Sequence, residues 1–200
     1  MTEVSLNQRI VLWARDKLGQ RVGRRGECWD LAERALSNSG AKTSRDLGEV
    51  GSDIDYVWGT AKEVSRVEAG DILQMRNYEV TTVTHTRVEW SDGTWEGNEE
   101  TETAGRSHHT AIVNGSPDRN GRVATLEQNV PPRGRVVQNL VLYTQSVPTT
   151  TTTTHEQRRH PETNTMTPAT VTTQVTITVS GRIWAYAPIQ RAAEEGGDDE

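Results

Sequence analysis

Two helices are predicted near the start of the chain from the spacing of its apolar residues. Over residues 5–18 apolar side chains recur every three or four positions, and Ser5 with Gln8 fits a capping box at the helix start. Over residues 28–37 a second stripe, which begins at Cys28, has the spacing of a helix buried on one face. Cys28 is therefore expected on the first turn of a helix.

The rest of the chain has the pattern of β-strands, with β-branched and apolar runs separated by turn residues. Residues 80–90 and a weaker partner from Thr94 flank Ser91-Asp92-Gly93, which predicts a hairpin. Gly181 interrupts an alternating run and is expected to form a bulge. Further strands are expected at 71–75, 110–113, 122–126, 136–143, 171–179 and 176–187.

Helices followed by antiparallel strands predict an α+β fold, with the N-terminal helices packed on a sheet of about five to seven strands. We expect one domain over residues 1–190, because about 100–200 residues suit a single domain. Residues 148–170 contain six consecutive threonines, three prolines and almost no apolar residue, so a disordered loop is expected there. Residues 191–200 form an acidic tail.

Composition and charge narrow the classes of function. The net charge of −6 argues against nucleic acid as the main partner, because nucleic-acid-binding proteins usually carry a basic surface. The single cysteine excludes an intramolecular disulfide. No stretch approaches the roughly 20 apolar residues of a membrane span, and the first residues lack the basic start of a signal peptide. We expect a monomer located in the cytoplasm, or one exported by a route without a cleaved signal.

Cys28 is the first candidate for chemistry. A free thiol titrates near pH 8.5, and both a helix N-terminus and nearby cations lower that value and increase the nucleophilic thiolate. Cys28 has both, since Arg24 and Arg25 lie close in sequence. A lone cysteine on an apolar stripe can also be a small core residue, which is the commoner case.

His109 and two polar residues further along could complete a site. His109 precedes a short apolar strand, from which it could reach the helix N-terminus and act as base for the thiol. Neighbouring strand residues point to opposite faces, so only one of His108 and His109 can do so. Glu127 and Asn129 are two apart on a strand and share a face, where either could orient the imidazole. Alternatively, His109 could be an exposed polar residue at the end of a strand, and Glu127 and Asn129 could lie at the entrance to a turn.

Together these segments resemble the CHAP domains, cysteine- and histidine-dependent amidohydrolases and peptidases of the papain-like NlpC/P60 group. The resemblance covers about residues 5–148 and 171–190. Its motifs, in the order of that family, are Gly26-Glu27-Cys28-Trp29-Asp30-Leu31-Ala32, Ala69-Gly70-Asp71-Ile72-Leu73, His109-Thr110-Ala111-Ile112-Val113, Leu126-Glu127-Gln128-Asn129 and Gly181-Arg182-Ile183-Trp184-Ala185-Tyr186-Ala187-Pro188.

The resemblance implies a papain-like fold and a cysteine hydrolase that needs no cofactor. It implies Cys28 as nucleophile, His109 as general base and then general acid, Glu127 as the residue that orients His109, and Asn129 as a supporting polar group. The implied substrates are amide bonds, in that family usually those of peptidoglycan peptides. Glu27 departs from the pattern, because such enzymes often have a Gln there as an oxyanion donor. Loss of one such donor typically costs about 10²–10³ in rate.

Other classes of function stay open on the sequence alone. The fold could be a non-catalytic or degenerate binding module, or a cytoplasmic amidase with a substrate outside the cell wall. A zinc hydrolase is not expected, because His155 and His160 are five positions apart where the H-E-x-x-H motif requires four.

Overall fold

The computed structural model describes residues 4–131 and 133–192, and helices precede strands along the chain. The helices are α1 (Leu6–Asp16), α2 (Cys28–Asn38) and the short α3 (Ser44–Leu47), with a 3-10 turn at Val64–Arg66. The strands are β1 (Thr60–Lys62), β2 (Ile72–Trp90), β3 (Trp95–Val113), β4 (Arg122–Glu127), β5 (Val137–Tyr143), β6 (Val147–Arg159) and β7 (Met166–Ala187). None of the helices within the described residues is long and apolar enough to cross a membrane.

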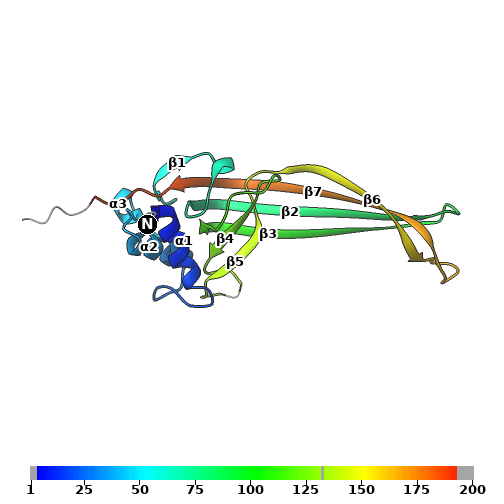
Figure 1. Cartoon of the computed structure of the whole chain (residues 1–200), viewed down its shortest axis with the longest axis horizontal. Coiled ribbons are helices and arrows are strands. Elements are labelled where there is room, and N and C mark those ends of the chain that lie inside the picture. The colour runs from blue at the N-terminus through cyan, green and yellow to red at the C-terminus, as the bar shows by residue number, and fades with distance from the viewer. Residues whose placement is uncertain (1–3, 132, 193–200) are drawn as a thin grey trace, which may run out of the picture.

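All strands belong to one antiparallel sheet of seven strands, in the order β1-β7-β2-β3-β4-β5, with β6 paired to β7. Both β1 and β6 lie on the same side of β7, β1 beside its C-terminal end and β6 beside its N-terminal part. The helices of the N-terminal segment pack on this sheet, as the α+β prediction requires (Figure 1). The finer expectation of an NlpC/P60-type arrangement stays a prediction.

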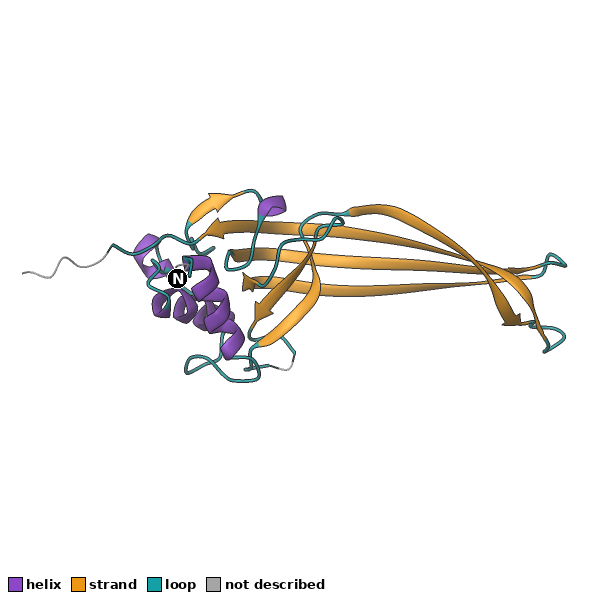
Figure 2. Ribbon diagram, in the orientation of Figure 1, coloured by secondary structure: helices purple, strands orange, loops and turns teal. Residues whose placement is uncertain are grey.

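The molecule has a head and an arm (Figures 1 and 2). The head holds the helices, β1, β4, β5 and the inner ends of the long strands. The arm, residues 79–105 and 147–180, holds β6 and the outer parts of β2, β3 and β7, which run far beyond the helices. β2 and β3 have 19 residues each, or about 60 Å of strand at roughly 3.3 Å per residue.

Gly181 marks the junction between head and arm. The pairing of β2 with β7 shifts register between Arg76 and Glu79, opposite this glycine. A bulge is therefore present at this point, but its extra residue lies in β2 and not at Gly181, as was predicted. Gly181 has φ +82°, and a Cβ there would come within 2.0 Å of the carbonyl oxygen of Asn77. Any larger residue would therefore push the two strands apart at this point.

The expectation of a disordered loop over residues 148–170 was wrong. β6 pairs with β7 from Val147 opposite Ile177 to Arg159 opposite Met166, and a short turn joins the two strands. β6 has no buried residue. Its sequence therefore lacks the alternation of apolar and polar residues from which a strand is usually predicted. Threonine nevertheless favours strand geometry, because its β-branch fits the pleated backbone. Of the expected acidic tail, residues 193–200 lie outside the described residues.

Two clusters of buried residues stabilise the head on opposite faces of the sheet, because neighbouring strand residues alternate between them. The helix-side cluster joins Ile10 of α1 and Leu31 of α2 to Ile72 of β2. The cluster on the other face continues into the base of the arm. There the Tyr78 hydroxyl donates to the carbonyl oxygen of Tyr143 (2.9 Å) and accepts from its N–H (2.8 Å). The helix-side packing fixes the start of α2 against the sheet.

Candidate active site

Cys28 is the first residue of α2, as predicted, and Glu27 is the N-cap. The N–H of Glu27 donates to a carboxylate oxygen of Asp30 at 3.1 Å, which satisfies a donor at the helix start. Gln128, which follows β4, links this helix start to the sheet. Its amide donates to the carbonyl oxygens of Glu27 (2.8 Å) and Val22 (2.9 Å) and accepts from the N–H of Val22 (2.7 Å). The helix start is therefore anchored by Gln128, whose side-chain amide forms three hydrogen bonds.

His109 of β3 and Cys28 line the same cleft, and His109 is close enough to change the pKa of the thiol. Burial alone would raise the pKa of Cys28, but the hydrogen bond and the charge of His109 outweigh burial and lower it. The backbone groups of Thr110 and Trp29 add to the lowering. Burial opposes the charge on His109 as well, yet Cys28 and then Glu127 raise the pKa of His109 from an ordinary 6.5 to about 9. These opposite shifts favour a thiolate beside an imidazolium.

Glu127, the last residue of β4, is fully buried behind His109. Its Oε2 lies 3.3 Å from Nε2 of His109, an ion-pair distance, although the ring N–H is not aimed closely enough to form a geometrically good hydrogen bond. The same oxygen accepts from Nε of Arg106 at 2.8 Å, and Oε1 accepts from the hydroxyl of Thr125 at 2.7 Å. Both oxygens of the carboxylate are thus occupied, which holds it in one orientation.

The pKa of Glu127 falls from an ordinary 4.5 to about 2. Burial would raise this pKa, but His109, and after it Arg106 and the Thr125 hydroxyl, favour the charged form more strongly. Glu127 is therefore a carboxylate at neutral pH. It supplies the negative charge that keeps the imidazole of His109 protonated.

Asn129 does not share a strand face with Glu127, and this part of the prediction was wrong. β4 ends at Glu127, and Asn129 has a left-handed backbone with φ +66°. Asparagine tolerates this conformation better than most residues. Its side-chain amide donates to the carboxylate of Glu27 at 2.6 Å. Asn129 thus lies on the Cys28 side of the site, beside the helix start.

A cleft of about 680 Å³ opens over Cys28 and His109. Its aromatic wall includes Trp29 and Tyr56, and His108 stacks on Tyr56 with ring centroids 5.7 Å apart. His108 lies 3.7 Å from a carboxylate oxygen of Asp55 rather than beside Glu127, as the alternation of strand residues predicts. The nucleophile candidate is therefore reachable through a cleft large enough for part of a peptide.

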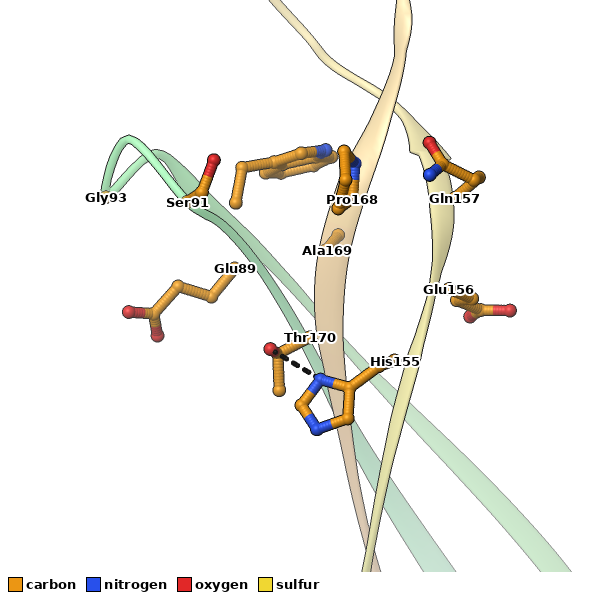
Figure 3. Close-up of a pocket in the computed structure, with 10 residues that line it drawn as sticks. Glu89, Ser91, Gly93, His155, Glu156, Gln157, Pro168, Ala169 and Thr170 are labelled. Atoms are coloured by element: carbon orange, nitrogen blue, oxygen red, sulfur yellow. Dashed lines mark hydrogen bonds between the residues drawn. The ribbon is translucent and has the colours of Figure 1, made fainter.

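A second hollow of about 800 Å³ lies at the tip of the arm, between the β2–β3 turn and the β6–β7 hairpin (Figure 3). Glu89, His155 and Thr170 line it, and Nδ1 of His155 lies 3.2 Å from the Thr170 hydroxyl. It lacks a thiol, since Cys28 is the chain's single cysteine. Within residues 4–131 and 133–192 no cluster of His, Cys, Asp or Glu could hold a metal ion. The chemistry therefore points to the cleft over Cys28.

Two residues of the site had no role in the sequence-based prediction. Arg106 pairs with Glu127, and Gln128 ties α2 to β4. Arg106 lies on β3 three residues before His109, so a search for a cation near the predicted acid could have found it. Gln128 lies between two predicted site residues. Its contacts could not be predicted, because they depend on the path of residues 22–27, and no sequence pattern in that segment indicates its path.

Comparison with known proteins gives one match. No curated protein and no solved structure matched this chain. A family model described as "AIM3/BBC1 Cysteine proteinase-fold domain" matches residues 3–196. The match supports the papain-like part of the prediction and not the CHAP family in particular. Because it covers nearly the whole chain, the chain belongs to the AIM3/BBC1 cysteine proteinase-fold domain family.

Proposed function

We propose that this chain is a cysteine-dependent hydrolase of amide bonds, a peptidase or amidase. One observation carries the proposal: Cys28 and His109 line an open cleft, and the buried carboxylate of Glu127 lies behind His109 at an ion-pair distance. The shifts of their pKa values favour the ionised thiolate–imidazolium pair. Perturbed titratable groups that face a cleft are a common property of catalytic sites.

The proposed reaction has two steps. The Cys28 thiolate attacks the amide carbonyl carbon and forms a C–S bond. The C–N bond then breaks as the imidazolium of His109 gives its proton to the leaving amine. Next, His109 removes a proton from a water molecule that attacks the thioester, and the released thiolate completes the cycle with a carboxylic acid as product. Glu127 keeps the ring of His109 oriented and stabilises its charge throughout. These steps use only side chains and water.

The substrate is proposed more coarsely than the reaction. Peptidoglycan peptides were expected from the resemblance to CHAP domains, whereas the matched family model names the proteinase fold alone. We therefore propose peptide-type amides as the substrate class, and peptidoglycan fragments are one subclass to be screened. Asn129 acts in this proposal through Glu27, by fixing the carboxylate that borders the nucleophile.

A second candidate function, a binding module without turnover, is favoured by Glu27. Its carboxylate borders the cleft directly before Cys28, and an ionised carboxylate cannot donate a hydrogen bond to an oxyanion. Asn129, an amide that also lines the cleft, directs one of its two N–H donors to that carboxylate. Without a side-chain donor, the oxyanion would depend on backbone N–H groups alone. The two candidates differ in turnover and not in the reactivity of the thiol.

Alkylation by iodoacetamide between pH 5 and pH 9 tests the Cys–His pair, because Cys28 is the only thiol. We expect an inflection well below the free-thiol value of about 8.5, which moves upward in His109→Ala. His85→Ala, on the exposed arm, is the matched control and should leave the profile unchanged. Release of nitrophenol from nitrophenyl acetate then separates the two functions. Continuous release supports the hydrolase, and one equivalent followed by no further release supports the binding module. An ordinary, mutation-insensitive thiol inflection would refute the proposed pair.

A further inference from the structure

Only some of the charged side chains that line the cleft form an ion pair with a group of opposite charge in the described chain. Arg24 and Arg25 border it on the segment just before α2, and neither guanidinium forms an ion pair with an acid of the described chain. Both residues are exposed, so their side chains are accessible to a ligand. An arginine offers planar pairs of N–H donors that match a carboxylate.

Arg45 adds a third guanidinium on the α3 side of the cleft. It lies over the ring of Trp29, with its central carbon 4.8 Å from the ring centroid, and its Nε is 3.4 Å from a carboxylate oxygen of Glu33. Glu33 itself accepts from the N–H and hydroxyl of Ser44. Arg45 is thus held in place and partly neutralised, which leaves Arg24 and Arg25 as the open cations of the cleft.

The two acids that line the cleft are both occupied. Asp30 accepts from the N–H of Glu27, and Glu27 accepts from the amide of Asn129. Three guanidiniums and two acids line the cleft, and Glu33, the acid that partly neutralises Arg45, is buried outside the lining. The N-terminus of α2, an 11-residue helix, points its partial positive charge at the same place. The Cys28–His109 pair adds no net charge when both groups are ionised.

We propose that the cleft selects an acyl substrate that carries a carboxylate near the bond to be cleaved, with Arg24 and Arg25 as the groups that bind it. The chemical class is a peptide with an acidic side chain or a free C-terminal carboxylate beside the scissile amide. This inference rests on the proposed function, because it assigns the specificity of the same site.

Two alkylating reagents of nearly equal size test the charge preference without a known substrate. Iodoacetate carries a carboxylate and iodoacetamide is neutral; in both cases the Cys28 sulfur forms a C–S bond and iodide leaves. The ratio of the two rates cancels any change in thiolate fraction. In Arg24→Gln/Arg25→Gln at low salt, we expect the iodoacetate to iodoacetamide ratio to fall about three- to fivefold. That is the order of the effect expected when two exposed unit charges near an anionic reagent are removed in water with little salt screening.

Arg158→Gln/Arg159→Gln is the matched control, because it removes the same charge from the arm. It should leave the ratio unchanged, and 1 M salt should reduce the wild-type ratio to that of the cleft variant. Equal ratios in the wild type and the cleft variant, or an equal fall in the arm variant, would overturn carboxylate selection. If the iodoacetate to iodoacetamide ratio falls in the cleft variant as expected but the thiol of the wild type shows an ordinary inflection, carboxylate recognition is supported and the catalytic proposal is overturned. Failure of the specificity proposal and failure of the proposed function are therefore distinguishable.

Discussion

Glu127→Gln removes the buried negative charge on which the site depends. The substitution keeps the size of the side chain and leaves Arg106, of which only 10% of the side chain is exposed, without its carboxylate partner. The pKa of Glu127 falls from 4.5 to about 2 in the folded chain. A shift of that size corresponds to about 3 kcal/mol of folding free energy at pH 7. A cost of about 3–5 kcal/mol for breaking a buried ion pair is consistent with it.

The stability lost in Glu127→Gln should depend on pH, and the direction of that dependence follows from the lowered pKa. Because folding lowers the pKa of Glu127, its stabilisation is complete above the unfolded value of 4.5 and is lost as pH falls toward about 2. The variant should therefore be less stable than the wild type by about 3 kcal/mol at pH 7 and by only about 1.5 kcal/mol at pH 3. Urea unfolding of both proteins at the two pH values measures this difference.

Glu99→Gln is the control for this experiment, because Glu99 is an exposed acid of the arm. It should change stability by less than about 0.5 kcal/mol at either pH. The same Glu127→Gln protein should show a higher inflection for Cys28 alkylation, since His109 loses the group that stabilises its charge. A stability difference that is the same at pH 7 and pH 3 would refute the assignment of Glu127 as a buried carboxylate.

Two further predictions concern the junction of head and arm and the oxyanion site. Tyr78→Phe leaves the N–H and carbonyl of Tyr143 without their partner, so we expect a loss of about 1–3 kcal/mol in urea unfolding; a loss below 0.5 kcal/mol would show that water replaces the hydroxyl. Glu27→Gln keeps an oxygen for the amide of Asn129 and adds a donor, so nitrophenyl acetate turnover should rise about tenfold or more. Unchanged turnover would mean that residue 27 does not reach the oxyanion.

The elements that could be predicted from the sequence are those with a local pattern. The capping box of Ser5 and Gln8 is present, with hydrogen bonds of 3.2 and 3.0 Å, and the stripe that begins at Cys28 gives α2. The turn at residues 91–93 joins β2 to β3 as expected. The sequence also predicted Cys28 at a helix start and His109 on a strand, and both residues line the same cleft; their catalytic roles stay a prediction.

The parts that were missed depend on partners far away in sequence. β6 is a strand because β7 supplies its hydrogen bonds, and no pattern inside a run of threonines shows that partner. The backbone of Asn129 turns left-handed directly after β4, a change that a two-residue spacing cannot reveal. The pairing of Arg106 with Glu127 depends on the approach of β3 and β4, which pair formally only at Ile112 and Val113.

The position of β7 has a consequence for how the chain is made. β2 and β3 are joined by a short turn, so they can pair as soon as both have left the ribosome. β7 joins β2 over its whole length, from Ile72 opposite Tyr186 to Trp90 opposite Ala169, and therefore closes a much longer loop than the β2–β3 turn does. Until residues 166–187 are synthesised, one edge of β2 in both head and arm stays open to any extended chain nearby. Pairing of β7 with β2 thus completes the sheet and removes this exposed edge, at which the unfinished chain could aggregate.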